Sequence, residues 1–471
     1  MISRQDIMDF AREFGLRPDI VEKDYVLGWV IAGIFNDPAL NAAWIFKGGT
    51  CLKKCFFETY RFSEDLDFTL TSSEHLQEKF LVDTFVKIAD WIYEKSGIEI
   101  PSDTVRFEIY KNPRGRLSVE GRIGYRGPMR QRGSLPRIKL DLTDDELLAL
   151  DPVIREVHHP YPDRPEGGIQ IQCYSYEELF AEKVRALAER ERPRDLYDVV
   201  HLYRQDDMNP DRAVVLNTLE KKCQYKGIAI PTITSLENQP ERVELEAEWG
   251  NMLAHQLPIL PPFQQFWQEL PQVFEWLYGT VPKAVARSYP MGAQIDPDWR
   301  PPGMVQFWGT KIPFEIIRFA AANHLCVDLT YKKSRRLIEP YSLRRTKDGN
   351  LLLHAVRHDD GEHRAYRIDR IEDASLTEIP FVPKYAIELT PSGPISAPVS
   401  NRVSTSLGRR KSVRGYFTPP KTSYGPKYVI ECPVCGKRFT HKTSKTTLNK
   451  HKDKQGYPCY GRIGYVVETK Y

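Results

Sequence analysis

The sequence lacks any long hydrophobic run and has few cysteines. A membrane-spanning helix needs about 18 consecutive apolar residues, and no such stretch occurs. No apolar segment follows a basic one near the first residue, as it would in a secretory signal. The 8 cysteines are scattered over 471 residues, except that Cys432 and Cys435 form a C-x-x-C pair. This usage argues against a secreted disulfide framework, so we expect a cytoplasmic protein with no membrane partner.

The net charge of +4 conceals an uneven distribution along the chain. Residues 401–471 contain 16 Lys and Arg against 3 Asp and Glu, a net charge of +13, and the preceding 400 residues carry −9. A basic tail on an acidic body indicates a polyanionic partner for the tail. The alternative is a solvated tail that is partly disordered.

The length exceeds that of one ordinary hydrophobic core, so we expect roughly two to four domains. Helical periodicity alternates with strand-like segments in the first part of the chain, which indicates an α+β fold. Ser175 and Glu178 predict a capping box at the start of a helix that ends near Arg190. The expected divisions are a mixed unit with a helical C-terminal part at 1–280, a proline-rich linker at 281–311, a β-rich unit of one helix and four strands (the last at 363–371) at 312–381, a flexible basic linker at 382–427 and a small module at 428–471.

The most informative segment joins a Gly-Gly-Thr turn to two closely spaced aspartates. Gly48, Gly49 and Thr50 are expected to begin a helix, where backbone N–H groups can approach phosphate oxygens. Asp65 and Asp67 lie two apart on an expected strand, so their side chains share one face. Neighbouring carboxylates repel each other unless a cation neutralises them. Oxygen ligands beside a phosphate site favour Mg²⁺ (or Mn²⁺), which can promote in-line phosphoryl displacement.

A third carboxylate is expected from the strand near residues 135–143. Asp141 alternates with Ile138, Leu140 and Leu142 and so faces away from the core. Glu120, on a neighbouring strand, is the rival candidate. The whole arrangement resembles the polymerase-β-type nucleotidyltransferase fold.

Two further segments resemble the AbiEii/AbiGii toxin family of nucleotidyltransferases: Glu22-Lys23-Asp24-Tyr25, and the stretch from Glu178 to Asp198 that contains Lys183, Arg190, Pro193 and Asp195. The resemblance implies transfer of NMP from an NTP to a nucleic-acid acceptor, such as the 3′ end of a tRNA. It also implies growth arrest or an anti-phage role and a cognate antitoxin. The implied roles are triphosphate binding by Gly48, Gly49 and Thr50, metal binding by Asp65, Asp67 and Asp141, activation of the incoming hydroxyl by Asp141, catalytic phosphate contact by Lys183, and support of the nucleotide site by Arg190, Asp195 and Asp198. The alternatives are a solvated Lys183 paired with glutamates, and simple capping or ion pairing for the last two aspartates.

Residues 312–381 resemble a WYL domain, a small β-barrel. The matching segments are 327–331, 336–343 and 366–371, whereas the triplet that names the domain is replaced by Leu351-Leu352-Leu353. The resemblance implies binding of nucleic acid or a nucleotide-like ligand through Arg336, Arg344, Arg367 and Arg370. The alternative is a structural module with ordinary surface arginines.

The C-terminal module has the residue types of a zinc-finger-like site. Cys432, Cys435, His451 and Cys459 would form a closed tetrahedral site for structural Zn²⁺, with His441 as the alternative fourth ligand. Basic residues between them, among them Lys437 and Arg438, favour contact with RNA or DNA.

Three functional classes therefore follow from the sequence. The first is a metal-dependent nucleotidyltransferase acting on nucleic acid. The second is a WYL and zinc-finger regulator whose transferase domain is vestigial or senses a ligand. The third is an enzyme that modifies a protein hydroxyl or a small molecule.

Overall fold

The computed structural model describes residues 1–131, 133–240, 242–283, 286–292, 294–296, 314–389, 427–441, 445–452, 458–459 and 461–470. These residues divide into two compact units, Met1–Val399 and Ser400–Tyr471. Among the described residues, no helix has the length and apolar character needed to span a membrane.

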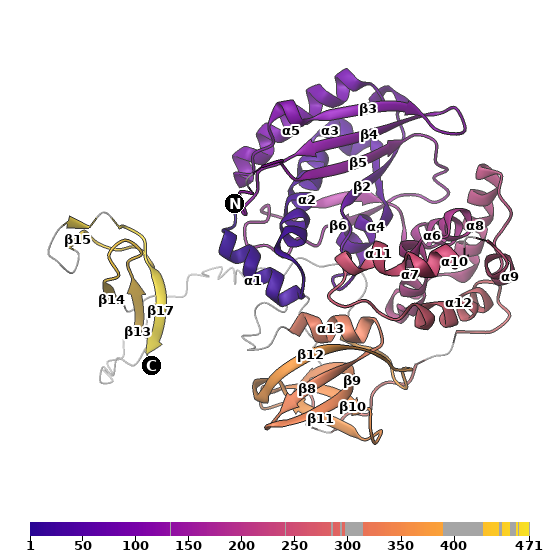
Figure 1. Ribbon diagram of the computed structural model, residues 1–471. Coiled ribbons are helices and arrows are strands. Elements are labelled where there is room, and N and C mark those ends of the chain that lie inside the picture. Colours follow the sequence, from indigo (N-terminus) through magenta and orange to yellow (C-terminus); the bar gives the residue numbers. More distant parts are fainter. Residues whose placement is uncertain are drawn as a thin grey trace, which may run out of the picture. The chain divides into compact units, whose positions relative to one another are not determined.

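The first part of unit one is built on a seven-stranded mixed sheet of order β3-β4-β5-β2-β1-β7-β6 (Figure 1). Its strands are β1 Trp44–Lys47, β2 Asp65–Leu70, β3 Arg106–Lys111, β4 Leu117–Gly124, β5 Arg137–Thr143, β6 Val153–Glu156 and β7 Gln170–Cys173. Strand β2 pairs with β5 in parallel and with β1 in antiparallel fashion. The sheet therefore brings segments from residues 44 to 173 into adjacent strands.

Helices precede, separate and follow the strands of this sheet along the chain. They are α1 Arg4–Phe14, α2 Pro18–Asn36, α3 Pro38–Ala43, α4 Gly48–Cys51, α5 Glu78–Ser96, α6 Tyr176–Arg190, α7 Pro193–Arg204, α8 Arg212–Lys226, α9 Ile233–Glu237, α10 Arg242–Ala247, α11 Trp249–Leu253 and α12 Phe263–Leu277. A π-helical turn at Leu52–Phe56 and 3-10 turns at 73–75, 102–104, 206–208 and 254–256 complete the helical segments.

Alternation along the strands decides which face carries the charged residues. Phe68 of β2 contacts Phe35 of α2, and Phe107 of β3 contacts Phe85 of α5, so α2 and α5 pack on one face. Asp67, the neighbour of Phe68, consequently faces the other side. That second face carries the charged side chains of β2, β5 and β4, together with Arg106 and Glu108 of β3.

The capping-box prediction for α6 is half correct. The Ser175 hydroxyl accepts from the Glu178 N–H at 3.2 Å. The Glu178 carboxylate instead accepts from the N–H groups of Ala149 and Leu150 and pairs with Lys222 at 2.9 Å. This fully buried carboxylate ties α6 to the loop after β5, because two donors and a cation outside the helix replace the reciprocal cap.

The β-rich part of unit one is a five-stranded antiparallel sheet of order β11-β10-β9-β8-β12 (Figure 1). It comprises α13 Phe314–Ala322, β8 Leu325–Tyr331, β9 Ser334–Arg345, β10 Leu351–Arg357, β11 His363–Arg367, a 3-10 turn at 368–370 and β12 Ile371–Pro380. The expected strand at 363–371 is thus β11 followed by that turn, and β12, which begins at Ile371, was not predicted from the sequence. Helix α13 also contacts α1, and Arg318 pairs with Glu58 at 3.1 Å.

Chain segments that precede and follow this sheet in the sequence pack against it. Tyr289 lies in the stretch expected as a linker, is buried, and donates a hydrogen bond to the Ala355 carbonyl at 2.8 Å. Glu388, in the stretch expected to be flexible, donates its backbone N–H to the Tyr341 carbonyl at 2.7 Å. Most of the remaining linker expectations, at 297–311 and 390–426, fall outside the described residues.

The second unit contains a three-stranded sheet of order β14-β13-β17 and a two-stranded one. Its strands are β13 Lys427–Glu431, β14 Arg438–His441, β15 His451–Lys452, β16 Pro458–Cys459 and β17 Tyr465–Lys470. A small core of Ile430, Cys432, Leu448 and Cys459 holds it together.

Candidate active site and metal centres

Three aspartates from two adjacent strands face the same side of the sheet. In the parallel pairing of β2 with β5, Asp67 lies opposite Asp141 and Asp65 lies opposite Lys139. Burial and then the charge of Asp141 raise the pKa of Asp67 to about 6, and burial likewise raises the pKa of Asp65. Carboxylates that are this close and this desolvated favour a cation between them. The oxygen-only donor set fits Mg²⁺ or Mn²⁺.

The turn before α4 is shaped around Asp67. Gly48 has φ of +81°, and a Cβ atom there would lie 2.1 Å from Asp67 Oδ2. A Cβ on Gly49 would lie 2.5 Å from Arg61 Nη2 and 3.0 Å from Ser63 Oγ. Both glycines therefore let charged side chains approach the start of a helix, where unpaired N–H groups favour anions.

Thr50 lies beside this turn, and its hydroxyl makes a hydrogen bond within the fold. Its side chain is fully buried, and its hydroxyl donates to the Asp65 carbonyl at 2.5 Å. Thr50 is not among the residues that line the pocket around the aspartates. It therefore fixes α4 to β2.

Lys183 reaches the same pocket from α6 and is held by two buried aspartates of α7. Its Nζ lies 2.7 Å from Asp198 Oδ2 and 3.3 Å from Asp195 Oδ1. Arg190 makes two hydrogen bonds to Asp195, at 2.7 and 2.9 Å. Arg61 makes two hydrogen bonds to Asp198, at 2.6 and 2.7 Å. This network fixes the position of Lys183.

The two α7 aspartates differ in their access to the pocket. Asp195 lines it, whereas Asp198 lies behind Lys183 and also accepts from Tyr60. Burial opposes ionisation of both, but the charges of Lys183 and Arg190 lower the pKa of Asp195. Arg61 and Lys183 bring the pKa of Asp198 far below its usual value. Both carboxylates are thus committed to ion pairs, Asp195 with Lys183 and Arg190 and Asp198 with Arg61 and Lys183.

The pocket has a volume of about 190 Å³ and includes residues that sequence reasoning left without a role. Arg192 directly precedes α7 and Arg194 lies in its first turn, and both line the pocket. Burial raises the pKa of Asp65, and the charge of Arg194 partly opposes that rise. Three arginines within five residues around Pro193 were the signal that could have identified them. The full lining is Gly49, Arg61, Ser63, Asp65, Asp67, Lys139, Asp141, Lys183, Arg190, Arg192, Arg194 and Asp195.

Glu120, the rival to Asp141, lies next to it on β4 but is engaged elsewhere. Glu120 pairs with Arg122 and lies 3.4 Å from Lys139 Nζ. Although burial opposes it, these cations lower the pKa of Glu120. Lys139 Nζ also lies 3.0 Å from Asp141 Oδ2, so pairing with Lys139 does not separate the two carboxylates. Asp141 lines the pocket and Glu120 does not, and this position favours Asp141 as the third carboxylate.

The Glu22–Tyr25 motif fastens the N-terminal helices to the loops around the site. Glu22 accepts from the Met129 N–H at 2.6 Å, and Lys23 pairs with Glu64 at 2.6 Å, one residue before Asp65. Asp24 pairs with the buried Lys54 at 2.7 Å. These contacts give the motif a positioning role outside the pocket.

The four WYL-like arginines are mostly engaged with their own sheet. Arg336 donates to the carbonyls of Tyr331 and Ser334, and Arg367 pairs with Asp369 at 2.8 Å. Arg344 pairs with Glu388. Arg370 is exposed, and its charge adds to that of Arg367 in lowering the pKa of Asp369. The structure therefore does not gather these four side chains into one ligand site.

The four predicted zinc ligands converge in unit two, with ligand atoms all within 4.8 Å of one another. Cys432 Sγ lies 3.7 Å from Cys459 Sγ, and Cys435 Sγ lies 3.4 Å from His451 Nε2. Zn–S bonds of about 2.3 Å in a tetrahedron give S–S edges of about 3.8 Å, so the spacing fits zinc. His441, the alternative ligand, is absent from this cluster. Arg438 pairs with Glu431 at 2.6 Å, and Lys437 follows the turn that the Gly436 N–H closes on the Cys432 carbonyl.

Two family models match parts of this chain. A family described as "Nucleotidyl transferase AbiEii toxin, Type IV TA system" matches residues 29–275, and the WYL domain family matches residues 314–376. Among solved structures, the chain is similar to the nucleotidyltransferase toxin MenT4 from Mycobacterium tuberculosis, with 15% identity, 59% of this chain and 90% of that chain covered, and a TM-score of 0.39. A second similarity is to the proteasome accessory factor B/C of Arthrobacter aurescens, with 12% identity, coverage of 78% and 74%, and a TM-score of 0.14. The comparison with curated proteins finds no match.

Proposed function

This chain belongs to the AbiEii family of nucleotidyl transferase toxins, and from that premise we propose that it transfers NMP from an NTP to a hydroxyl of a nucleic acid. The observation that carries the proposal is the set of three carboxylates, Asp65, Asp67 and Asp141, in register on β2 and β5. A tRNA 3′ end is the acceptor we propose. Membership of a type IV toxin–antitoxin family implies an antitoxin partner.

One group of residues binds the triphosphate, and Asp141 activates the acceptor hydroxyl. Gly48, Gly49 and Lys183 hold the triphosphate, with the arginines around Pro193 neutralising its outer charge. The acceptor oxygen forms a bond to the α-phosphorus, the bond from that phosphorus to the bridging oxygen breaks, and pyrophosphate leaves. Asp141 accepts the proton of the acceptor hydroxyl and passes it to solvent.

A divalent cation, held by Asp65, Asp67 and Asp141, supplies charge neutralisation at the transferring phosphoryl group. The raised pKa of Asp67, about 6, supports this assignment. An unpaired desolvated carboxylate is costly, and a cation removes that cost.

We assign Zn²⁺ to Cys432, Cys435, His451 and Cys459 as a structural ion, since four cysteine and histidine ligands leave no open position. The thiolate form suits this role. Burial opposes the thiolate form of Cys432, but hydrogen bonds from the backbone N–H groups of Cys435 and Val434 outweigh burial and lower its pKa to about 6. The basic surroundings of the site make this module a second contact for nucleic acid, with Lys437 and Arg438 as contacts.

The test is transfer of label from each α-labelled NTP to total RNA in the presence of Mg²⁺. We expect one or a few RNA species to become labelled, and Asp67→Asn or Asp141→Asn to lower the rate by at least about a hundredfold. Asp83→Asn is the matched control, because Asp83 is exposed on α5 and pairs only with Lys79 among the described residues. Label on protein or on a small molecule would refute the acceptor assignment. No transfer by the wild type with any NTP or acceptor would leave a WYL and zinc-finger regulator as the better reading.

A further inference from the structure

The charged face of the sheet continues past the aspartates to the outer edge strand. In the pairing of β5 with β4, Arg122 lies opposite Lys139, and in the pairing of β4 with β3, Arg106 lies opposite Arg122. Residues directly opposite each other point to the same side of a sheet. A row of cationic residues therefore runs from Asp65 on β2 across β5, β4 and β3.

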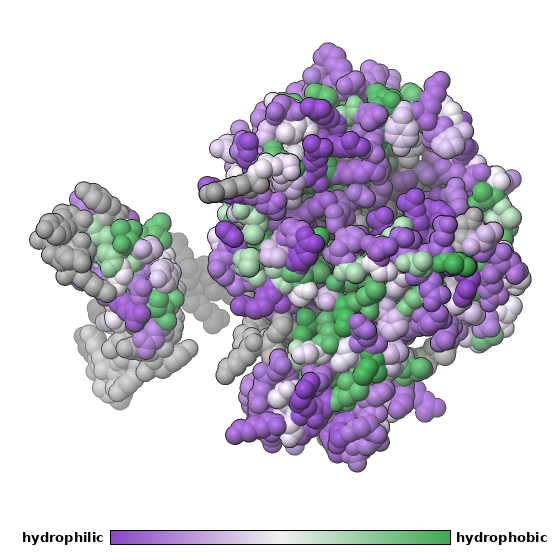
Figure 2. Space-filling view, in the orientation of Figure 1, coloured by the Kyte–Doolittle hydropathy of each residue, from purple (hydrophilic) through white to green (hydrophobic). Residues whose placement is uncertain are grey.

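This row faces away from the helical layer. Phe107 packs against Phe85 of α5, so its neighbour Arg106 faces the opposite side. Arg106, Arg122 and Arg137 are all exposed. Figure 2 shows hydrophilic side chains over most of the visible face of unit one. A charged, uncovered sheet face is available to a partner.

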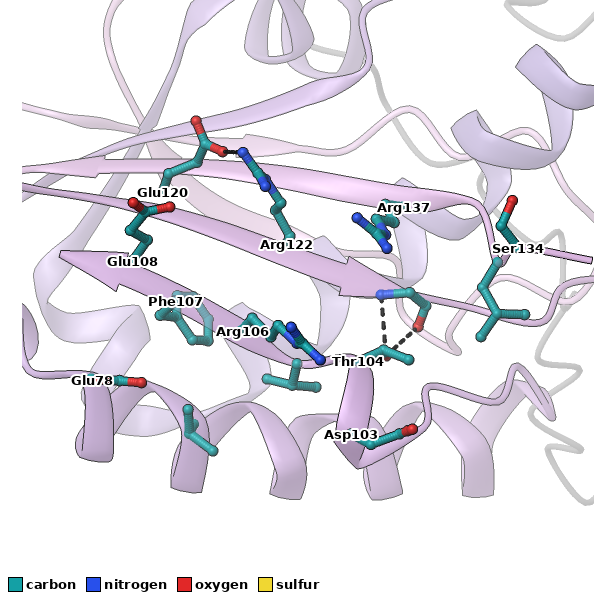
Figure 3. A pocket seen from close by; sticks show the side chains of 14 residues that line it. Glu78, Asp103, Thr104, Arg106, Phe107, Glu108, Glu120, Arg122, Ser134 and Arg137 are labelled. Carbon is teal, nitrogen blue, oxygen red and sulfur yellow. Dashed lines mark hydrogen bonds and ion pairs between the residues drawn. The ribbon is translucent and has the colours of Figure 1, made fainter. Parts of the chain in front are cut away.

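A cavity of about 590 Å³ opens where the row reaches the edge of the sheet. Figure 3 shows Arg106 from β3 and Arg137 from β5 beside this cavity, with no dashed line joining either to another side chain drawn. No ion-pair partner for either guanidinium is found among the described residues. In contrast, Arg122 is joined to Glu120 (Figure 3). Arg106 and Arg137 are thus available for an anionic ligand.

The carboxylates on this face are partly neutralised. Glu120 is paired with both Arg122 and Lys139. Glu108 remains, against the free Arg106 and Arg137. Glu78 and Asp103 also line the cavity, so its lining as a whole carries no positive excess. Binding of a phosphate there depends on the forked donors of Arg106 and Arg137, which have no ion-pair partner among the described residues, and not on net charge.

We propose that this face of β3, β4 and β5, defined by Arg106, Arg122, Arg137 and Lys139, binds the phosphate backbone of the acceptor strand and leads its terminal hydroxyl to Asp141. The inference rests on the proposed function and deepens it. Lys183 and the arginines around Pro193 approach the aspartates from α6 and α7, which leaves the β5 side for the acceptor. Arginine suits phosphate through its forked donors.

The length of the row matches a short segment of nucleic acid. Strands lie about 4.8 Å apart, so three steps from β3 to β2 cover roughly 14 Å. Successive phosphates advance about 3.4 Å along one stacked strand, so the row spans roughly four nucleotides. A terminal single-stranded segment of that length would place its last hydroxyl at the carboxylates.

The experiment compares the full-length Arg106→Gln/Arg137→Gln double variant with wild type in steady-state transfer to the labelled RNA. We expect the acceptor KM to rise about tenfold or more, and the log–log salt slope of binding to fall by about 1.4, or about 0.7 for each lost single-strand phosphate contact. The kcat at saturating acceptor and the KM for NTP should stay within about twofold, since neither arginine lines the nucleotide pocket. Arg12→Gln/Arg17→Gln is the matched control, because both arginines are exposed on the N-terminal helices.

Three outcomes would overturn the proposal. They are an unchanged acceptor KM and salt slope, an equal effect of the control pair, and a rise in the KM for NTP instead. Selective loss of binding to an acidic peptide would assign the face to a protein partner and also refute it. If the wild type transfers nothing, the proposed function fails, and RNA binding measured by fluorescence anisotropy still tests the surface. All variants retain the basic C-terminal segment, so differences in slope report on the sheet alone.

Discussion

Replacing Asp67 with asparagine should stabilise the metal-free protein while it abolishes transfer. The pKa of Asp67 is raised to about 6 from an ordinary value of 3.8. Above pH 6 the ionised carboxylate therefore costs stability, at 1.36 kcal/mol per pH unit, or about 3 kcal/mol in all. Asparagine has the shape of the neutral acid and avoids this cost. We expect a gain of about 2 kcal/mol after local relaxation, which corresponds to roughly 4–8 °C in melting temperature for a domain of about this size.

The pH dependence and the metal response separate this cause from ordinary packing. Because the folded-state pKa lies above the unfolded one, the wild type loses stability as pH rises from about 4 to 6, and the loss is complete above pH 6. The advantage of Asp67→Asn should therefore be absent at pH 4 and full at pH 7.5 in thermal unfolding with EDTA. Added Mn²⁺ or Mg²⁺ should stabilise the wild type, by about 2.7 kcal/mol at a hundredfold excess over Kd, and the variant far less. An asparagine variant that is less stable than wild type at pH 7.5 without metal would refute the reasoning.

Two other substitutions should behave differently. Asp198→Asn should destabilise unit one by about 3–5 kcal/mol in denaturant unfolding, because it leaves Arg61 and Lys183 buried without their countercharge; stability within about 1 kcal/mol of wild type would contradict the network. Cys459→Ser should lower the zinc content, measured by mass spectrometry, from one ion per chain to less than about half. Unit two should unfold, while the rate of NTP hydrolysis by unit one should stay within about twofold of wild type. Unchanged zinc content would exclude Cys459 as a ligand.

The sequence was sufficient to predict the elements that carry the site. Asp65, Asp67 and Asp141 were predictable because strand alternation has a period of two, and each lies between core residues such as Leu66 and Leu140. Gly48 was identifiable from its place before a helix. Convergence of the zinc ligands was likewise predictable, because a C-x-x-C turn leaves few geometries for a metal.

Long-range contacts were beyond such local patterns. Thr50 has the residue type of a phosphate ligand, yet its hydroxyl is taken by a carbonyl 15 residues away. Glu178 fits a capping box, yet Lys222 and two loop N–H groups hold it. Arg344 looked available for a ligand, yet Glu388 reaches it from beyond the last strand. In each case the side chain interacts with a residue distant in sequence in place of the local partner or ligand. A single sequence does not show which of these interactions forms.

The aspartates in and behind the pocket form two groups whose pKa values shift in opposite directions. This difference indicates where the protein itself does not supply enough positive charge. Asp195 and Asp198 are the more deeply buried, yet their pKa values are lowered, because Lys183, Arg190 and Arg61 surround them. Asp65 and Asp67 keep raised pKa values, because burial and the charge of Asp141 outweigh the cations nearby, which are Lys139 for Asp65 and Lys47 and Lys183 for Asp67. The fold places cations directly beside Asp195 and Asp198 but too few beside Asp65, Asp67 and Asp141. We therefore expect a bound ligand to supply the missing positive charge at these three carboxylates. A divalent cation together with the triphosphate it accompanies is the ligand that satisfies both the carboxylates and the arginines around them.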